Sequence, residues 1–489
     1  MKLTDEQRVI VDRLSDPNFN GNMKIIAYAG TGKTTTLMAI CKALPNKKIL
    51  NLSFNRSVAD EAKTKFPGNV TSETFHGIAH IKMGKPDLVQ NPKDFVNQYL
   101  KAYPEDSFWS VWGGYRTLVK FCETDATEIT LAHALNEKNM DSYRNLSKNK
   151  GYTDMFVAVA KRMWDHWEAN PDSKVLHPMY LKRFTLSTAC ELNEFDMLLV
   201  DEAQDANPSM LAILKKVKCQ IVVVGDPHQQ IYEFNGAINA LDQCDYETYY
   251  LTQSFRFGED IAEWSNDILL HTRAFDGTHL IRGKKKGRSI IREESDMGTE
   301  DLWNLDAVIC RTNKDCYDSS KILVNNSIPY NFSNSKEAAK ELDTILELRR
   351  NWPDKKRYMG CKSWLELVRY SGENSSDVPH AWMVQHVEKG MGNAIKDFVD
   401  GSVASGVYLT TAHRAKGLEW DHVLITGSYF ADRKKISEEE LRLFYVACTR
   451  AIKTLFIANS PDNYMEIMGD FVKKLKEQNI KVVKVSDIL

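Results

Sequence analysis

The sequence predicts an α/β protein with parallel sheets flanked by helices, and three observations carry that prediction. A run typical of a strand over 24–27 is followed by a glycine-rich turn and a helical pattern over 35–44. A second apolar run over 195–200 ends in two adjacent acidic residues, and a third over 220–224 ends in a polar segment. Ligands of open α/β sheets bind outside the carboxyl ends of strands, so these loops are the candidate sites.

Length and composition indicate several folded cores. A chain of 489 residues exceeds one ordinary core and predicts roughly three domains. Its 43% hydrophobic and 27% charged residues are typical of a soluble globular protein. With 64 basic and 66 acidic residues the net charge is -2, so a nucleic-acid site must be a local groove and not the whole surface.

The nine cysteines are odd in number, scattered and never spaced Cys-x-x-Cys. This pattern argues against a zinc ribbon, a disulfide framework and an iron–sulfur cluster, and it favours a reducing compartment. The N-terminus lacks an apolar signal core, and no apolar run approaches the ~18 residues that span a membrane. We therefore expect a cytoplasmic or nucleoplasmic protein without a membrane partner.

A capping box predicts the first helix. Thr4 and Gln7 have the spacing of the box and precede an amphipathic run. As a cap residue Gln7 needs no ligand. Upstream of a phosphate-binding turn, its amide is also suited to adenine, because it donates and accepts at once. Both interpretations stay open at this point.

The glycine-rich turn has the residues of a phosphate-binding loop. Gly30 and Gly32 allow a tight turn whose N–H groups face one point, and the dipole of the following helix adds a positive field. Lys33 would reach the outer phosphates, and the Thr34 hydroxyl would hold Mg²⁺. Ala27 occupies a place where the usual pattern has glycine, so a chance glycine turn before a helix is the alternative.

Weaker signals follow the next predicted strand, which covers 48–53. Aromatic and polar side chains stand at its end and at the mouth of a loop further on: Phe54, Asn55, Thr74, Phe75 and His76. Packing explains such groups more often than binding does. From 86 to 184, helical periodicity rich in Trp and Tyr predicts a helical subdomain with an aromatic core.

Side chains suited to hydrolysis follow the two buried strands. Asp201 ends the first strand and would hold Mg²⁺, while Glu202 would orient and deprotonate an attacking water. Gln229 follows the second strand and is suited to sensing a γ-phosphate, and Tyr232 and Phe234 offer faces for bases. Adjacent acids on a loop are commonplace, so the prediction depends on their position at a strand end.

The second half of the chain has similar sequence patterns of strands and helices. We predict a strand over 306–311, a helical insertion over 336–402 and a helix over 440–451. The helix carries Arg450 at its far end, and Arg256 follows a short apolar segment. Taken alone, either arginine is an ordinary surface or helix-end charge.

In their order along the chain, these segments resemble the UvrD/Rep family of superfamily 1 helicases and, among them, the compact relatives of the F-box DNA helicase. The resemblance rests on the glycine turn and on five segments: Asp-Glu-Ala-Gln-Asp, Gly-Asp-Pro-His-Gln-Gln-Ile-Tyr, Gln-Ser-Phe-Arg, Ala-His-Arg-Ala-Lys-Gly-Leu-Glu and Tyr-Val-Ala-Cys-Thr-Arg-Ala. It covers nearly the whole chain apart from two insertions. The family also commonly has alanine where Ala27 stands.

The resemblance implies two RecA-like P-loop domains that face each other across one ATP, each with a mainly helical insertion. The first domain would comprise 1–88 and 186–250, with the insertion 89–185. The second would comprise 251–335 and 403–489, with the insertion 336–402, which is shorter than in larger relatives.

The family motifs imply roles for the matching residues. Gln7 would contact adenine, Phe255 would stack on it in place of the family's usual tyrosine, and Glu419 would meet the ribose. Arg256 and Arg450 would touch the γ-phosphate, so that hydrolysis requires closure of the cleft. The implied catalytic residues are Lys33, Asp201, Glu202, Gln229, Arg256 and Arg450. The implied ATP-binding residues are Gln7, Ala27, Tyr28, Ala29, Gly30, Thr31, Gly32, Lys33, Thr34, Thr35, Phe255 and Glu419, with Thr34 and Asp201 as Mg²⁺ ligands.

By the same resemblance, single-stranded DNA would lie across both domains, where stacking contributes about 1 to 3 kcal/mol per base with little sequence preference. Phe234 stands where the family has tryptophan and Asn235 where it has arginine, and both changes weaken the expected grip on bases. The implied DNA-binding residues are Phe54, Asn55, Thr74, Phe75, His76, Tyr232, Phe234, Arg311 and His413.

The expected function is an ATP-driven helicase and translocase that moves 3′ to 5′ on single-stranded DNA and unwinds tailed duplexes in replication, repair or recombination. The alternative is a DNA-responsive ATPase that acts as a sensor or as a subunit of a repair or defence complex. RNA stays open as a substrate. Little chain follows Arg450, so we do not expect a fused nuclease. Repair or replication proteins are the expected partners.

Overall fold

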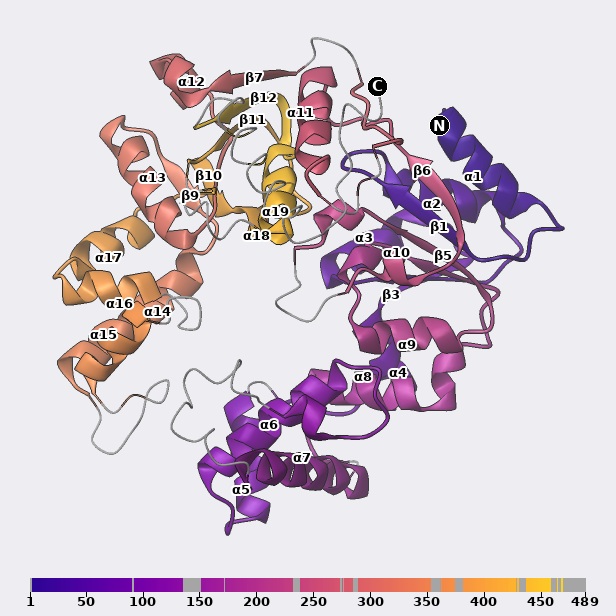
Figure 1. Cartoon of the computed structure of the whole chain (residues 1–489), viewed down its shortest axis with the longest axis horizontal. Coiled ribbons are helices and arrows are strands. Elements are labelled where there is room, and N and C mark those ends of the chain that lie inside the picture. The colour runs from indigo at the N-terminus through magenta and orange to yellow at the C-terminus, as the bar shows by residue number, and fades with distance from the viewer. Residues whose placement is uncertain are drawn as a thin grey trace, which may run out of the picture. The chain divides into compact units, whose positions relative to one another are not determined.

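The computed structural model describes residues 2–89, 92–134, 151–170, 172–231, 238–272, 275, 277–284, 289–352, 361, 363–373, 381–427, 429–430, 437–458, 464 and 468. The chain forms two compact units. The first unit comprises Met1–Ala27 and Gly32–Leu251, and the second comprises Tyr28–Thr31 and Thr252–Leu489. Each unit contains a six-stranded parallel sheet flanked by helices, which confirms the predicted α/β class (Figure 1).

The first sheet has the strand order β3-β2-β4-β5-β1-β6, and all its pairings are parallel. Its strands are β1 (Met23–Ala27), β2 (Ile49–Ser53), β3 (Val70–Thr74), β4 (Met197–Val200), β5 (Gln220–Gly225) and β6 (Glu247–Leu251). Every residue of β2 and β4 is buried, because helices cover both faces of a parallel sheet. The four strands predicted in this half of the chain are confirmed.

Helices surround this sheet and form a separate group between β3 and β4. Those near the sheet are α1 (Asp5–Ser15), α2 (Lys33–Ala43), α3 (Arg56–Lys65), α4 (Phe75–Lys82), α9 (Pro208–Lys216) and α10 (Ala240–Gln243). The group between the strands consists of α5 (Pro92–Ala102), α6 (Phe108–Cys122), α7 (Gly151–Ala169) and α8 (His177–Leu186). The helical character predicted for this stretch is therefore confirmed, whereas the proposed domain boundaries stay a prediction.

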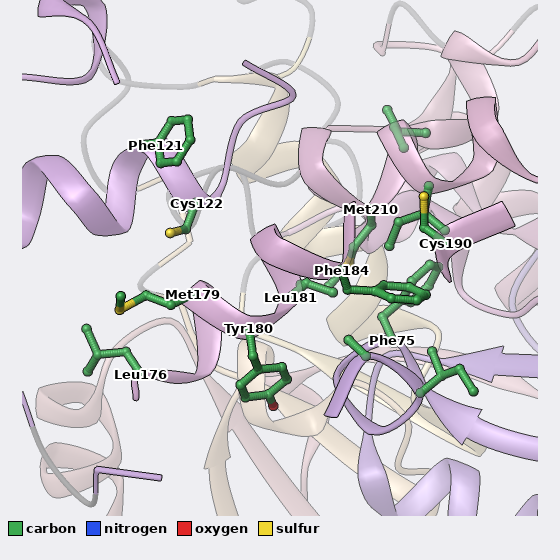
Figure 2. Packing of buried hydrophobic residues seen from close by; sticks show 14 of the residues in the cluster. Phe75, Phe121, Cys122, Leu176, Met179, Tyr180, Leu181, Phe184, Cys190 and Met210 are labelled. Atoms are coloured by element: carbon green, nitrogen blue, oxygen red, sulfur yellow. The ribbon is translucent and has the colours of Figure 1, made fainter. Parts of the chain in front are cut away.

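The helical group shares its hydrophobic core with the sheet. Tyr180, Leu181 and Phe184 of α8 belong to one buried cluster with Phe75 of α4 and Met210 of α9 (Figure 2). Residues from β2, β4 and β5 belong to the same cluster. A second cluster lies around α1, α2 and β1.

The second sheet has the order β7-β12-β11-β8-β10-β9, again with parallel pairings. Its strands are β7 (Ile290–Glu293), β8 (Ala307–Cys310), β9 (Tyr330–Phe332), β10 (Val407–Thr411), β11 (Trp420–Ile425) and β12 (Ala451–Ile457). Its helices are α11 (Glu259–Leu269), α12 (Thr299–Trp303), α13 (Asn313–Asn325), α14 (Ser335–Arg350), α15 (Trp364–Glu373), α16 (Ala381–Glu388), α17 (Gly392–Asp400), α18 (Ala412–Ala415) and α19 (Glu438–Cys448).

Three local predictions differ from the structure. The helix predicted over 440–451 ends at Cys448, so Arg450 follows it, and Ala451 begins β12. The helix after the glycine turn begins at Lys33 and not at Thr35, because the backbone turns helical directly after Gly32. The loop expected at Thr74 is absent from this described segment, since β3 continues into α4 and Thr74 is the N-cap of that helix. The capping box of α1 is confirmed. Within the part of the chain that the structure describes, every helix is too short or too polar to span a bilayer.

Candidate nucleotide and nucleic-acid site

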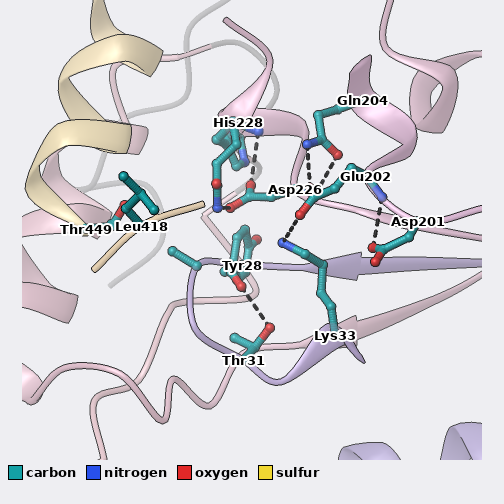
Figure 3. A network of polar contacts seen from close by, with 12 residues as sticks. Tyr28, Thr31, Lys33, Asp201, Glu202, Gln204, Asp226, His228, Leu418 and Thr449 are labelled. Atoms are coloured by element: carbon teal, nitrogen blue, oxygen red, sulfur yellow. Dashed lines mark hydrogen bonds and ion pairs between the residues drawn. The ribbon is translucent and has the colours of Figure 1, made fainter. Parts of the chain in front are cut away.

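The glycine turn connects β1 to α2 with the geometry that the sequence predicts. Gly30 and Gly32 have φ angles of 73° and 81°, in the left-handed region that favours glycine. Thr31 closes the turn, because its N–H and its hydroxyl both donate to Tyr28 O at 3.3 and 2.8 Å (Figure 3). Lys33 then opens α2, so the first N–H groups of this helix lie beside the turn.

Lys33 contacts the acidic pair that follows β4. Lys33 Nζ lies 3.5 Å from Glu202 Oε1, and Asp201 Oδ1 accepts the Glu202 N–H at 2.9 Å (Figure 3). Glu202 itself has a φ angle of 53°, an uncommon value for a residue with a side chain. Strained backbone of this kind clusters at functional sites. The residues that the sequence places at the ends of β1 and β4 are therefore brought together.

Asp201 has the environment of a metal ligand. Its residue is only 6% exposed. Burial, followed by the charge of Glu202, raises the pKa of the Asp201 carboxyl above its ordinary range, and Lys33 offsets part of that effect. A carboxylate in this position gains stability from a divalent cation, and Mg²⁺ prefers oxygen ligands. Thr34, in the first turn of α2, is exposed, and its role as the second ligand of the ion stays a prediction.

A hydrogen-bonded network extends this group to the end of β5. Gln204 Nε2 donates to Glu202 Oε2 at 2.7 Å, and Gln204 Oε1 accepts the Asp226 N–H at 3.1 Å. Asp226 Oδ2 in turn accepts from Gln229 Nε2 at 2.7 Å. Gln204 and Asp226 were not among the predicted site residues. Their position at the carboxyl ends of two paired strands was the available signal.

Gln7 is buried, at 1% exposure, and both ends of its amide have protein partners. Its Oε1 accepts the Thr4 N–H at 3.0 Å, and its Nε2 donates to Thr36 Oγ1 at 3.0 Å. Gln7 thereby links the start of α1 to α2. The cap role is confirmed, and the adenine contact stays a prediction.

The segment Tyr28–Thr31 groups with the second unit, and its backbone carbonyls accept hydrogen bonds from residues that follow β6. Ser254 Oγ donates to Ala29 O at 3.0 Å, and the Phe255 N–H donates to Gly30 O at 2.8 Å. The Phe255 residue is 41% exposed, which leaves its ring accessible for stacking. Its predicted contact with adenine is untested by these observations.

Arg256 and Glu419, both predicted to contact ATP, contact each other. Arg256 Nε donates to Glu419 Oε2 at 2.6 Å, and Arg256 Nη1 donates to Thr449 O at 3.0 Å. The carboxylate and a backbone carbonyl thus hold two of the three nitrogens of the guanidinium. This pair orients Arg256 within the second unit.

Arg450 is 1% exposed and bonds to its surroundings within the second unit. Its Nε donates to Val446 O at 2.8 Å, and its Nη1 donates to Leu418 O at 3.2 Å. Nη2 donates to Thr449 Oγ1 at 3.0 Å. These bonds give Arg450 a structural role after α19. Its contact with a γ-phosphate stays a prediction.

The predicted DNA-binding residues of the first unit lie at the carboxyl ends of two paired strands. Ser53 and Thr74 are register partners in β2 and β3, so the segments that follow them are neighbours. The Phe54 and Phe75 rings are 5.3 Å apart. Phe75 is only 1% exposed, however, so its placement supports packing and not the expected contact with bases. Asn55 is exposed.

His76 also has a protein partner, since its Nδ1 lies 3.2 Å from Tyr180 Oη. In the second unit, Arg311 and His413 follow the paired strands β8 and β10. Arg311 Nε donates to Glu440 Oε2 at 2.8 Å. The predicted contacts Tyr232 and Phe234 lie outside the described residues.

These features define a class of protein. The parallel sheets, the glycine turn that opens a helix at Lys33 and the acidic pair after a neighbouring strand are those of P-loop proteins. The family model of an AAA domain matches residues 14–235, and the model of a UvrD-like helicase C-terminal domain matches residues 386–461. The chain belongs to the UvrD-like superfamily 1 helicases and is related to the F-box helicases.

Three relatives illustrate this membership. F-box DNA helicase 1 of Gallus gallus is 28% identical over 535 residues, which cover 96% of this chain and 50% of that protein. F-box DNA helicase protein 1 of Schizosaccharomyces pombe is 27% identical over 526 residues, covering 93% of this chain and 57% of that protein. Gabija protein GajB of Bacillus cereus is 22% identical over 521 residues, which cover 94% of this chain and 97% of that protein. The chain thus spans about half of the length of the F-box helicases it matches.

Proposed function

We propose that this protein is an ATP-dependent DNA helicase that translocates 3′ to 5′ on single-stranded DNA and unwinds duplexes. The observation that carries the proposal is the contact of Lys33 with Glu202 beside the buried Asp201, in a chain of the UvrD-like family. Replication, repair or recombination would use this activity. The direction of movement is taken from the family resemblance.

In the proposed reaction, a water attacks the γ-phosphorus of ATP while the bond to the β–γ bridging oxygen breaks. Glu202 accepts the proton of that water, and Lys33 neutralises charge on the outer phosphates. Mg²⁺ held by Asp201 and Thr34 would add charge neutralisation at the phosphate oxygens. Arginines that contact a transferring phosphoryl group contribute roughly 10³ to 10⁵ in rate, and we assign that role to Arg256 and Arg450.

Single-stranded DNA would contact side chains at the carboxyl ends of paired strands in each unit. Phe54 and Asn55 would serve in the first unit, and Arg311 and His413 in the second. Contacts of this kind suit an unwinding motor, because stacking and phosphate contacts hold any sequence. Opening one base-pair step costs about 1.4 kcal/mol on average, which small ATP-driven steps can supply.

The test compares wild type with Lys33→Ala. ATP hydrolysis is measured with and without single-stranded DNA, together with strand displacement from 3′-tailed and 5′-tailed duplexes. We expect strong stimulation by DNA, displacement from the 3′ tail alone, and loss of both in Lys33→Ala. Displacement from the 5′ tail would contradict the direction. A parallel series with single-stranded RNA tests the choice of nucleic acid.

The match to GajB favours a second candidate, because it covers 97% of that protein whereas the F-box matches cover about half. In this candidate the chain is a DNA-stimulated ATPase that serves as a sensor or subunit of a defence or repair complex. Stimulated hydrolysis without displacement from either tail, with unwinding restored by a co-purified protein, would favour it over the autonomous helicase.

A further inference from the structure

Gln204 lies between the ends of two neighbouring strands of the first sheet. It follows β4 in the short helix η5 (Ala203–Asp205), and its residue is fully buried. Its amide donates to Glu202 Oε2 at 2.7 Å and accepts the Asp226 N–H at 3.1 Å (Figure 3). These two partners allow one orientation of the amide, because the reversed group would set donor against donor and oxygen against carboxylate.

Gly225, the last residue of β5, has no side chain, and Gln204 occupies the space that a side chain there would need. A Cβ atom at Gly225 would lie 2.3 Å from Gln204 Oε1 and 3.0 Å from Ala203 N. The first of these distances is far below van der Waals contact. Because Gln204 is buried and bonded at both ends of its amide, it has little freedom to withdraw. A side chain at position 225 would therefore displace Gln204.

Asp226 continues the chain of bonds toward Gln229. Its Oδ1 accepts the His228 N–H at 3.1 Å, and its Oδ2 accepts from Gln229 Nε2 at 2.7 Å. Glu202, proposed to take the proton of water, is thus connected to Gln229, proposed to contact the γ-phosphate, through Gln204 and Asp226. The connection runs between the carboxyl ends of β4 and β5, which pair in the sheet.

We propose that Gln204 is a positioning residue that holds the Glu202 carboxylate and couples it to Gln229, and that Gly225 is required to admit it. This inference rests on the proposed ATP hydrolysis. Lys33 lies 3.5 Å from one carboxylate oxygen of Glu202, and Gln204 holds the other at 2.7 Å. Loss of Gln204 removes the hydrogen bond to this oxygen, and we expect the carboxylate to shift toward Lys33 and away from the position needed to take the proton of water.

The principal variant is Gln204→Met, which removes the donor to Glu202 without placing a second carboxyl group beside it. We expect kcat for ATP hydrolysis to fall about 10- to 100-fold, as small misplacements of catalytic groups do. The KM for ATP should stay within about twofold, because the glycine turn and Lys33 keep their contacts. A normal kcat, or a rise in KM that accounts for the whole loss, would overturn the proposal.

Gly225→Ala should reproduce the loss in kcat, whereas Gly68→Ala should not, because a Cβ at Gly68 meets nothing within 4 Å. In a Gln204→Ala background, where the close contact is removed, Gly225→Ala should lower kcat little further. If Gly225→Ala lowered kcat as much in that background as in the wild type, Gly225 would act independently of Gln204.

Hydrogen exchange provides a readout that needs no turnover. The Asp226 amide should exchange faster in Gln204→Ala and stay protected in Gln204→Glu, which retains its acceptor. Equal protection in both variants would contradict the bridge. A wild type that hydrolyses ATP without unwinding DNA would refute only the helicase. A wild type that does not hydrolyse ATP would refute the proposed function and the positioning role together.

Discussion

His76 lies at the contact between α4 and α8, where its imidazole is partly buried. Its Nδ1 is 3.2 Å from Tyr180 Oη, and the His177 ring centroid is 6.0 Å away. Burial, followed by the nearby His177, lowers the pKa of His76 to about 4. The neutral imidazole is therefore the form that suits the folded state.

This lowered pKa predicts a loss of stability in acid. The unfolded chain binds a proton at His76 near pH 6.5, whereas the folded chain does so only near pH 4. Stability should therefore fall as the pH drops through this window, by about 1 to 2 kcal/mol at pH 5 from this group. Urea unfolding at pH 7.5 and pH 5 measures the effect.

His76→Gln is the matched variant, because its amide can still bond to the Tyr180 hydroxyl and does not titrate. We expect a smaller difference in stability between pH 7.5 and pH 5 for this variant. The pKa values of His133 and His271 are also lowered by burial, so these residues should maintain part of the dependence of stability on pH. An unchanged difference would exclude His76 as its source.

At the level of elements, the start of α4 depends on Thr74. Its hydroxyl accepts the Gly77 N–H at 2.8 Å, and its backbone is extended as an N-cap requires. Thr74→Ala should destabilise the first unit by about 1 kcal/mol, whereas Thr74→Ser should be nearly neutral. Thermal unfolding of both variants tests this. Equal stability of the two variants would contradict the capping role.

The first turn of α19 is joined to the end of β8 by an ion pair. Glu440 accepts from Arg311 Nε at 2.8 Å, and the two side chains are 22% and 31% exposed. Glu440→Gln should lower stability by about 1 to 2 kcal/mol, because it leaves a partly buried guanidinium without its carboxylate. The measurement is the unfolding midpoint in urea.

Replacing both partners, in Arg311→Met with Glu440→Met, should recover part of that loss, since neither charge is then left alone. If the double variant lost more stability than the single variants Arg311→Met and Glu440→Met lose when added together, the pair would not be the origin of the effect.

At the level of the whole molecule, each unit has a hydrophobic core of its own. Ile345 is fully buried in a cluster of the second unit, and Ile25 is fully buried in a cluster of the first. Removal of buried aliphatic groups costs about 2 to 5 kcal/mol. Ile345→Ala should therefore lower the midpoint temperature of the calorimetric unfolding transition of the second unit, and Ile25→Ala should lower that of the first.

Because the clusters are distinct, we expect each change to shift one transition by several degrees and to leave the other nearly in place. Equal shifts of both transitions in both variants would show that the two units unfold together.

Sequence alone predicted the features that depend on local pattern. The glycine turn, the opening of a helix near Lys33 and the acidic pair after an apolar run are each set by neighbours along the chain, because turns and strands have short sequence periods. The capping box of α1 is equally local. Short strands such as β7 and β9 were missed, because three or four residues carry little periodicity.

The tertiary structure decided which of these local features meet. Pairing of β4 with β5 brings Gln204 to Asp226, 22 residues away, and no local pattern encodes that contact. Burial of Phe75 likewise depends on a helix distant in sequence, α8, which contributes to the same cluster. The sequence by itself therefore determined five of the strands, the turn and the candidate groups. Strand order and burial, which arise from long-range packing, decided how those groups are positioned.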